Sequence, residues 1–239
     1  MADQDKFKAV RDFYNQNYYA QSEATHEHWT WHDRVIAGRL GDLRGKHVLD
    51  VACGLGQWLD LLHGQGARVS GIDISQRAIE QCRHRLPEGD FRVGPAETLP
   101  FADASFDLVT CMGSLEHFLD KPAALREMLR VAAPGARFLI LVPNAGFLTR
   151  RLGLYRGTQQ TKIREDVCTL DEWDSLFQAA GLVVERRWRD LHTLDRDWIV
   201  MGPPWTWPLR TLQALALPLW PLSWQYQVHH YCRRASQPK

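Results

Sequence analysis

The sequence predicts an α/β fold in which helices cover a parallel β-sheet. Short apolar runs recur along the chain, and stretches with helical spacing of their apolar residues separate them. Strands and helices that alternate at this spacing form right-handed βαβ units. The chain has 239 residues, of which 45% are hydrophobic and 24% charged, and these values fit one domain over residues 1–239.

The predicted elements follow in order. Two helical stretches come first, because Phe7, Val10 and Tyr14 recur at helical spacing and Trp29–Leu40 is amphipathic. The predicted strands are His47–Val51, Ala67–Ile72, Phe91–Val93, Phe106–Cys111, Arg137–Val142, Leu182–Trp188 and Tyr226–Cys232. The predicted helices between them are Leu55–His63, a helix capped by Ser75 that runs to about Leu86, Pro122–Val131, and Thr169–Ala180 ended by Gly181. Pro134-Gly135 is predicted to be a turn.

Two long segments interrupt this alternation, and long connections are often functional. Residues 145–168 follow the fifth strand and carry five basic side chains, whereas residues 190–224 follow the sixth strand and are rich in Trp and Pro. Ligands of open α/β sheets bind beyond the carboxyl ends of the strands. We therefore expect the two insertions to build a substrate pocket together. The basic residues would favour an anionic group, or they form a solvated loop.

The segment Val48–Gly56 is predicted to bind a nucleoside-containing cofactor. It is a strand followed by a turn with Gly54 and Gly56 and then a helix, so a ligand can approach the backbone and the N–H groups of the helix. Asp73 ends the next strand, where a carboxylate can accept both hydroxyls of an adenosine ribose. The alternative is a tight turn that binds nothing.

Asp50 distinguishes between two cofactor classes that use such a turn. A nicotinamide dinucleotide requires a third glycine, but Leu59 stands at that position. The Asp50 carboxylate would also repel a pyrophosphate, whereas the ammonium group of S-adenosylmethionine (SAM) can pair with it, directly or through water. We therefore predict SAM as the cofactor and S-adenosylhomocysteine (SAH) as its product.

Residues 47–144 resemble the class I SAM-dependent methyltransferases, of the type 11 kind. The motifs that carry the resemblance are Asp50–Gly56, Gly71–Ile74, Gly94–Phe101, and Phe106-Asp107 through Leu115–His117. The resemblance implies a Rossmann-like sheet of seven strands with an antiparallel last strand, a SAM-binding core at 45–144 and an N-terminal helical lid at 1–44. The cofactor contacts that it implies are Tyr18, Asp50, Ala52, Cys53, Gly54, Gly56, Asp73, Ile74, Ala96, Glu97, Cys111 and Met112.

The chain departs from the family pattern at two positions. Ala52 stands where the family often has Gly, a small change that the turn should tolerate. Pro95 stands where the family often has an Asp that contacts the adenine amino group, so adenine recognition would rest on Ala96 and Glu97.

The stretch Cys111–His117 is similar to the ubiquinone-biosynthesis O-methyltransferases, and the resemblance places it beside the methionine end of SAM. A hydroxyl acceptor needs a base near neutral pH, most often His. His117 is the first candidate, unless it only caps or packs a short helix, and His192 is the second. Some of those relatives hold a metal ion with acidic residues and the His, but Gly113 replaces one acidic ligand here, so no metal site is assigned.

Charge and composition limit the kinds of partner that the protein can bind. Lys and Arg total 29 against 28 Asp and Glu, so no net field attracts nucleic acid. Met1–Lys8 has no apolar leader, which predicts a cytoplasmic location. Residues 205–224 combine four Trp with a single charge and suit either an apolar pocket wall or a peripheral membrane contact. Core packing or a dimer seam would look the same, so the sequence leaves open a monomer or a homodimer.

Together these observations predict an enzyme that moves a methyl group from SAM to a small-molecule acceptor. We expect the acceptor atom to be an oxygen of a lipophilic or sugar-type compound. The alternatives are N- or C-methylation on the same fold, and a non-catalytic SAM-binding module that serves a partner.

Overall fold

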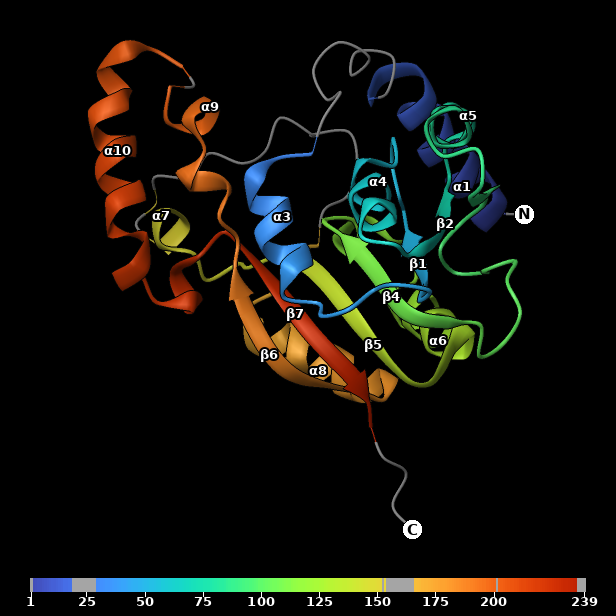
Figure 1. Ribbon diagram of the computed structural model, residues 1–239. Helices are drawn as coiled ribbons and strands as arrows, with labels where there is room; N and C mark the ends of the chain where they lie inside the picture. Colours follow the sequence, from blue (N-terminus) through green and yellow to red (C-terminus); the bar gives the residue numbers. More distant parts are fainter. Residues whose placement is uncertain (1, 19–28, 152, 154–165, 201, 236–239) are drawn as a thin grey trace.

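A seven-stranded sheet forms the centre of the protein in the computed structural model, which describes residues 2–18, 29–151, 153, 166–200 and 202–235 (Figure 1). The strand order is β3-β2-β1-β4-β5-β7-β6. The strands are β1 (His47–Val51), β2 (Arg68–Asp73), β3 (Asp90–Val93), β4 (Phe106–Met112), β5 (Ala132–Pro143), β6 (Leu182–Arg189) and β7 (Gln227–Arg234). Only β7 runs against its neighbours in this sheet. The predicted sheet with its antiparallel last strand is therefore confirmed.

Helices cover both faces of the sheet. The helices are α1 (Ala2–Phe13), α3 (Trp31–Gly38), α4 (Gln57–Gly64), α5 (Gln76–Arg85), α6 (Lys121–Val131), α7 (Leu148–Arg151), α8 (Leu170–Ala180), α9 (Arg196–Ile199) and α10 (Trp207–Ala216). The helices α3, α4 and α5 share one apolar cluster with the sheet, whereas α6 and α8 share another. Burial on both faces explains why the strands read as nearly continuous apolar runs.

The predicted helix ends are confirmed where capping residues set them. The Ser75 side chain accepts a hydrogen bond from the backbone N–H of Ala78 and starts α5. Thr169 and Glu172 form a capping box at the start of α8, which ends at Gly181 with a φ of +93°. Local side-chain chemistry therefore decides these boundaries.

One predicted turn is wrong. Pro134 and Gly135 lie inside β5, where the pairing with β4 shifts register between Phe106 and Leu108. Gly135 has a φ of +83°, which glycine adopts at low cost. The strand therefore continues through an irregularity.

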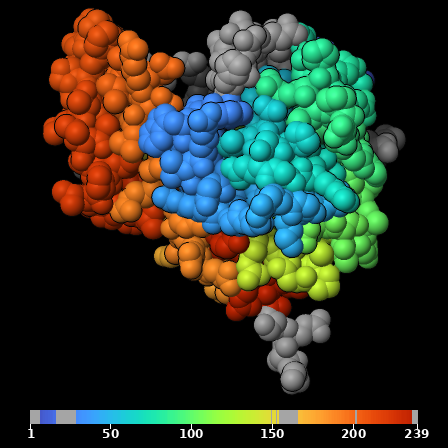
Figure 2. Space-filling model, viewed as in Figure 1, coloured from blue at the N-terminus to red at the C-terminus, as the bar shows by residue number. Residues whose placement is uncertain are grey.

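Both insertions begin at the carboxyl edge of the sheet, because β5 and β6 run in the same direction. The second insertion is more regular than predicted: it contains α9, α10 and four single-turn 3₁₀ helices, at His192–Leu194, Pro204–Thr206, Leu217–Leu219 and Leu222–Trp224. Its helices α9 and α10 project as a lobe beside the body of the protein (Figure 2). None of the described helices is long and apolar enough to span a bilayer.

Candidate active site

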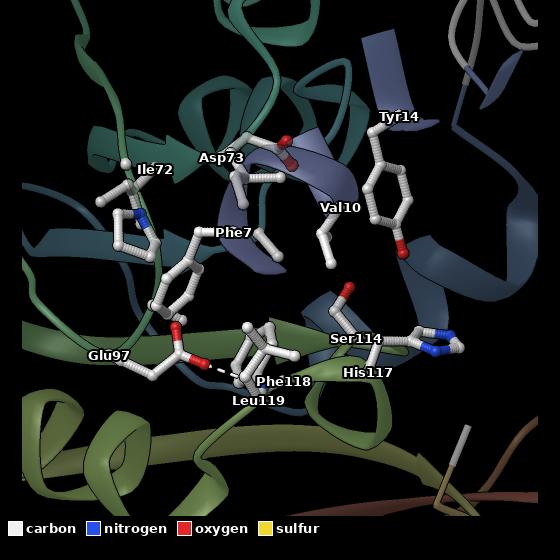
Figure 3. Close-up of a pocket in the computed structure, with 15 residues that line it drawn as sticks. Phe7, Val10, Tyr14, Ile72, Asp73, Glu97, Ser114, His117, Phe118 and Leu119 are labelled. Atoms are coloured by element: carbon white, nitrogen blue, oxygen red, sulfur yellow. Dashed lines mark hydrogen bonds between the residues drawn. The ribbon is translucent and has the colours of Figure 1, made fainter. Parts of the chain in front are cut away.

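A pocket lies at the carboxyl ends of β1, β2 and β4, beneath the N-terminal helix (Figure 3). Its walls come from five parts of the chain. They include Phe7, Val10 and Tyr14 from the N-terminal helical segment, Ala52 from the turn after β1, Asp73 and Ile74 from the end of β2, Gly94–Glu97 after β3, and Ser114 and His117–Leu119 after β4. The sheet topology alone brings the last four parts together, since parallel strands end at one edge.

The turn after β1 is held open by unusual backbone angles. Ala52, Gly54 and Gly56 have φ values of +61°, +54° and +80°. A Cβ added at Gly56 would come within 2.9 Å of the Cys82 Sγ, so glycine is needed there for space as well as for conformation. Ala52 stands where the family often has glycine, and its methyl group makes this positive φ unfavourable.

Asp73 is buried and oriented by the backbone around it. The N–H of Gly54 donates to its Oδ2 at 3.0 Å, and the N–H of Ser75 donates to its Oδ1 at 2.8 Å. Each carboxylate oxygen can accept more than one hydrogen bond, and a carboxylate at the end of this strand is the group that accepts ribose hydroxyls in nucleotide-binding folds. Asp73 lines the pocket at the end of β2.

Asp50 lies beneath the turn and is 2% exposed. Burial raises the pKa of its carboxyl to about 7, the hydrogen bond from Thr110 opposes this shift, and the nearby Asp73 carboxylate adds to it. The Thr110 hydroxyl donates to Asp50 Oδ1 at 2.6 Å. A cationic group beside Asp50 would favour its ionised form and lower this pKa.

The segment after β3 forms one side of the pocket. Ile74, Pro95 and Ala96 supply apolar surface. Glu97 also lines the pocket, and its Oε1 accepts hydrogen bonds from the N–H of Leu119 at 2.9 Å and of Asp120 at 3.2 Å. Glu97 thus also ties two walls of the pocket together, a role that the sequence did not predict.

The N-terminal helix contributes residues that sequence reasoning did not assign to the site. Phe7, Val10 and Tyr14 point into the pocket, and the Tyr14 ring extends toward the side where Ser114 and His117 lie (Figure 3). Their helical spacing was visible in the sequence. The Ser75 hydroxyl donates to Asn15 Oδ1 at 2.6 Å and so links this segment to the start of α5. The backbone of Tyr18 belongs to the π-helical turn Tyr14–Tyr18, but its side chain lies outside the described residues.

His117 lies on the short 3₁₀ helix Leu115–His117 and borders two hollows. The first is the pocket that contains Asp73. The second is broader and reaches Lys121, Asp166 and Cys168, so the end of the first insertion lines it. The Lys121 Nζ donates to Asp166 Oδ2 at 3.0 Å across this hollow. His117 therefore lies between the cofactor turn and the first insertion.

Apart from Tyr18, seven predicted site residues do not line the first pocket, namely Asp50, Cys53, Gly54, Gly56, Cys111, Met112 and His192. The first four of these belong to β1 and the turn after it. Cys111 is fully buried in the core, and the half-buried Met112 packs against the apolar cluster that α3, α4 and α5 share with the sheet. His192 follows β6, where its Nδ1 bonds the buried Asp190 carboxylate. Neighbouring strands lie about 4.8 Å apart, so β6 is about 14 Å from β4. Among the described residues, no group of three or more His, Cys, Asp or Glu is placed to hold a metal ion.

Known proteins with this sequence pattern identify the family. A model of a methyltransferase domain matches residues 49–140. A demethylmenaquinone methyltransferase of Beutenbergia cavernae is 31% identical over 170 residues, which cover 65% of this chain and 71% of that protein. A probable S-adenosylmethionine-dependent methyltransferase of Mycolicibacterium smegmatis is 34% identical over 163 residues, or 68% of this chain. This chain belongs to the SAM-dependent methyltransferases.

Other matches span less than two thirds of the similar protein's length. The match spans 62% of the M. smegmatis protein and 41% of an O-methyltransferase of Penicillium expansum that is 40% identical over 114 residues. Two solved structures share the fold of this methyltransferase over nearly its whole length. One is the methyltransferase chain of a complex with the Trm112 activator of Haloferax volcanii, with a TM-score of 0.73, 22% identity and coverage of 96% and 99% of the two chains. The other is magnesium protoporphyrin IX methyltransferase of Synechocystis with bound SAH, with a TM-score of 0.65, 16% identity and coverage of 95% and 99%.

The residues of this methyltransferase fit SAM, the cofactor of its family. Asp73 offers a carboxylate for ribose hydroxyls, and Ile74, Pro95 and Ala96 offer an apolar wall for adenine. Asp50 is a buried acid whose raised pKa makes a cationic partner favourable. In contrast, a phosphate-bearing cofactor would meet two buried acids at the same turn.

Proposed function

We propose that this methyltransferase moves a methyl group from SAM to an oxygen of a lipophilic or sugar-type small molecule. The observation that carries the proposal is the shared pocket: Asp73 and His117 line the same hollow from different strands (Figure 3). A cofactor held at Asp73 would therefore have a titratable group of the protein within the same cavity. An oxygen acceptor needs such a group to take its proton.

Each residue then has a distinct task. SAM supplies a methyl group on a positively charged sulfur, and in-line attack by the acceptor oxygen forms the C–O bond while the C–S bond breaks. Asp73 accepts the ribose hydroxyls and Asp50 pairs with the ammonium group. Ala96 and Ile74 pack on the adenine, and residues 1–44 act as the lid. His117 takes the proton that the acceptor oxygen loses.

The acceptor is proposed to bind on the His117 side, next to the insertions. Asn144 connects the two insertions, because its Nδ2 donates to the carbonyls of Ser223 at 2.9 Å and Gln225 at 3.0 Å. The second hollow extends from His117 to the end of the first insertion. The similarity to an O-methyltransferase supports oxygen as the acceptor atom. His192 remains a second candidate base, for an acceptor that reaches from β4 to β6.

Calorimetric titration with SAM tests the proposed binding of the cofactor at Asp73. The Asp73→Ala variant should lose at least about a hundredfold in SAM affinity, because the ribose hydroxyls lose a charged acceptor. Asp107→Ala is the matched control: Asp107 also accepts a backbone hydrogen bond, from the N–H of His47 at 2.9 Å, but at the opposite edge of the sheet. Equal SAM affinity in the Asp73 variant and its control would refute the assignment.

A screen of extracts with methyl-labelled SAM tests the acceptor half. Label should appear in a lipophilic or sugar-type compound, bound through oxygen. Once the acceptor is known, His117→Ala should lower kcat by about a hundredfold or more while leaving the heat of SAM binding unchanged. Unchanged turnover would remove His117 from the mechanism. Label on nitrogen or carbon, or SAM binding without any transfer, would overturn oxygen methylation.

A further inference from the structure

The second insertion carries a row of exposed apolar side chains along one side of α10. This leucine ridge consists of Trp205, Leu209, Leu212, Leu215 and Leu219, which are 63% to 88% exposed. Their spacing of three or four residues keeps most of them on one helix face. Soluble proteins rarely expose a contiguous apolar patch of this kind unless it binds something.

The ridge cannot fold inward, because the other side of α10 already packs on the protein. Ala214 and Leu217 are buried there. The Arg210 guanidinium donates to the Trp198 carbonyl at 2.8 Å and lies 4.8 Å from the centre of the Trp198 ring. The helix is thus fixed in an orientation that presents its leucines outward.

The charges around the ridge favour one class of partner. Residues 198–239 contain no Asp or Glu, and Arg210, which faces inward, is the only Arg or Lys before Arg233. Arg150 and Arg151 are exposed on α7, and α7 begins only four residues after Asn144, which bonds the end of the second insertion. The ridge and these arginines both follow the carboxyl ends of strands, so they lie beyond the same edge of the sheet. An uncharged ridge and exposed arginines at one edge complement a surface that is apolar inside and negatively charged outside.

We propose that the leucine ridge docks this protein onto a bilayer that contains anionic phospholipid. The leucines and Trp205 enter the interface between headgroups and acyl chains, where Trp is favoured, and the arginines of α7 meet the headgroups. The α9–α10 lobe projects from the body, as an inserting surface must (Figure 2). The lobe also starts at the sheet edge that holds the candidate active site, so docking deepens the proposed function by bringing a lipophilic acceptor to this edge.

Flotation of the full chain with vesicles tests the proposal. We expect the protein to float with vesicles of phosphatidylcholine and phosphatidylglycerol, and more weakly with phosphatidylcholine alone. A double variant, Leu212→Glu with Leu215→Glu, should bind the mixed vesicles at least about tenfold more weakly, because two apolar insertions are lost and two negative charges are added. Val35→Glu places the same charge at an exposed apolar position on α3, outside the ridge, and should float like the wild type.

A second double variant separates the contribution of charge to membrane binding from that of the apolar side chains. Arg150→Gln with Arg151→Gln should remove the preference for phosphatidylglycerol while weak binding to phosphatidylcholine remains. Sedimentation of each variant checks the rival occupant, a second copy of this chain. A wild type that dimerises through the ridge and never floats would overturn the proposal, as would a Leu212/Leu215 variant that floats normally. The heat of SAM binding should be the same in the wild type, the Leu212/Leu215 variant and the Arg150/Arg151 variant, so a failure here is distinguishable from a failure of the methyltransferase assignment.

Discussion

The cofactor side and the acceptor side of this methyltransferase differ in how their residues are held. On the cofactor side, short-range backbone hydrogen bonds orient Asp73, and positive φ angles shape the turn after β1. On the acceptor side, two insertions far apart in sequence are joined through Asn144, and the outer surface of α10 is left apolar. The first side presents polar groups within a pocket, and the second presents apolar groups to its surroundings.

This difference shows which parts of the chain recognise the cofactor and which recognise the acceptor. A strand, turn and acid recognise one cofactor in any member of the family, because the geometry is local. Acceptor recognition depends on loops that a rigid scaffold positions, and such loops vary freely. The variants below separate the two sides, in order of decreasing expected effect.

The largest effect is expected at Asp50. Because burial raises its pKa to about 7, the folded state holds this proton more tightly than the unfolded chain. The free energy of unfolding should therefore fall by up to about 4 kcal/mol as the pH rises from about 4 to about 7. Asp50→Asn should remove this fall, measured by urea denaturation across that range.

SAM binding gives a second readout at Asp50. Pairing with an ammonium group lowers the pKa, so binding at about pH 6 should release a proton from the wild type. Calorimetry in two buffers with different ionisation heats measures this release, and Asp50→Asn should show none. Identical heats in both buffers for the wild type would contradict the pairing.

Two asparagines probe the two sides in parallel. Asn144→Ala should lower the free energy of unfolding by about 2 to 3 kcal/mol, because buried carbonyls and the Gly146 N–H lose their partner. SAM affinity should hardly change. Asn15→Ala should do the reverse: it unties the lid segment from Ser75 and weakens SAM binding several-fold with little loss of stability. If both variants lowered only the free energy of unfolding, or both weakened only SAM binding, the cofactor side and the acceptor side would not be independent.

The smallest effect is expected at Ala52. Its φ of +61° costs about 1 kcal/mol for a residue with a side chain, and glycine relieves this cost at the expense of a more flexible unfolded chain. Ala52→Gly should raise the midpoint of thermal unfolding slightly. Ala104→Gly is the matched control, since Ala104 also has a positive φ of 52° but lies away from the pocket. A loss of stability in the Ala52 variant alone would show that the turn needs the methyl group.

Much of the cofactor side could be predicted because its signals are local. Ser75, Thr169 and Gly181 set helix ends through their own side chains or backbone. The short apolar runs located the strands to within two residues at each end, except for the start of β5. Two secondary-structure predictions were wrong, and in both the local signal was misleading. Pro134-Gly135 is a turn signal, but β5 pairs with β4 on both sides of it, at Ala132 and at Arg137. The sequence did not predict α10, because Pro and Trp obscure its apolar periodicity.

The sequence by itself determined the order of the strands, the family and the chemical class of the cofactor, because these depend on residues close together in the chain. Only the tertiary structure decided that Phe7, Val10 and Tyr14 face Asp73, and that His117 shares the pocket while His192 ends three strands away. It also decided that α10 turns its leucines outward. These properties depend on which segments pack against each other, and periodicity shows that a helix has an apolar face without showing what that face contacts.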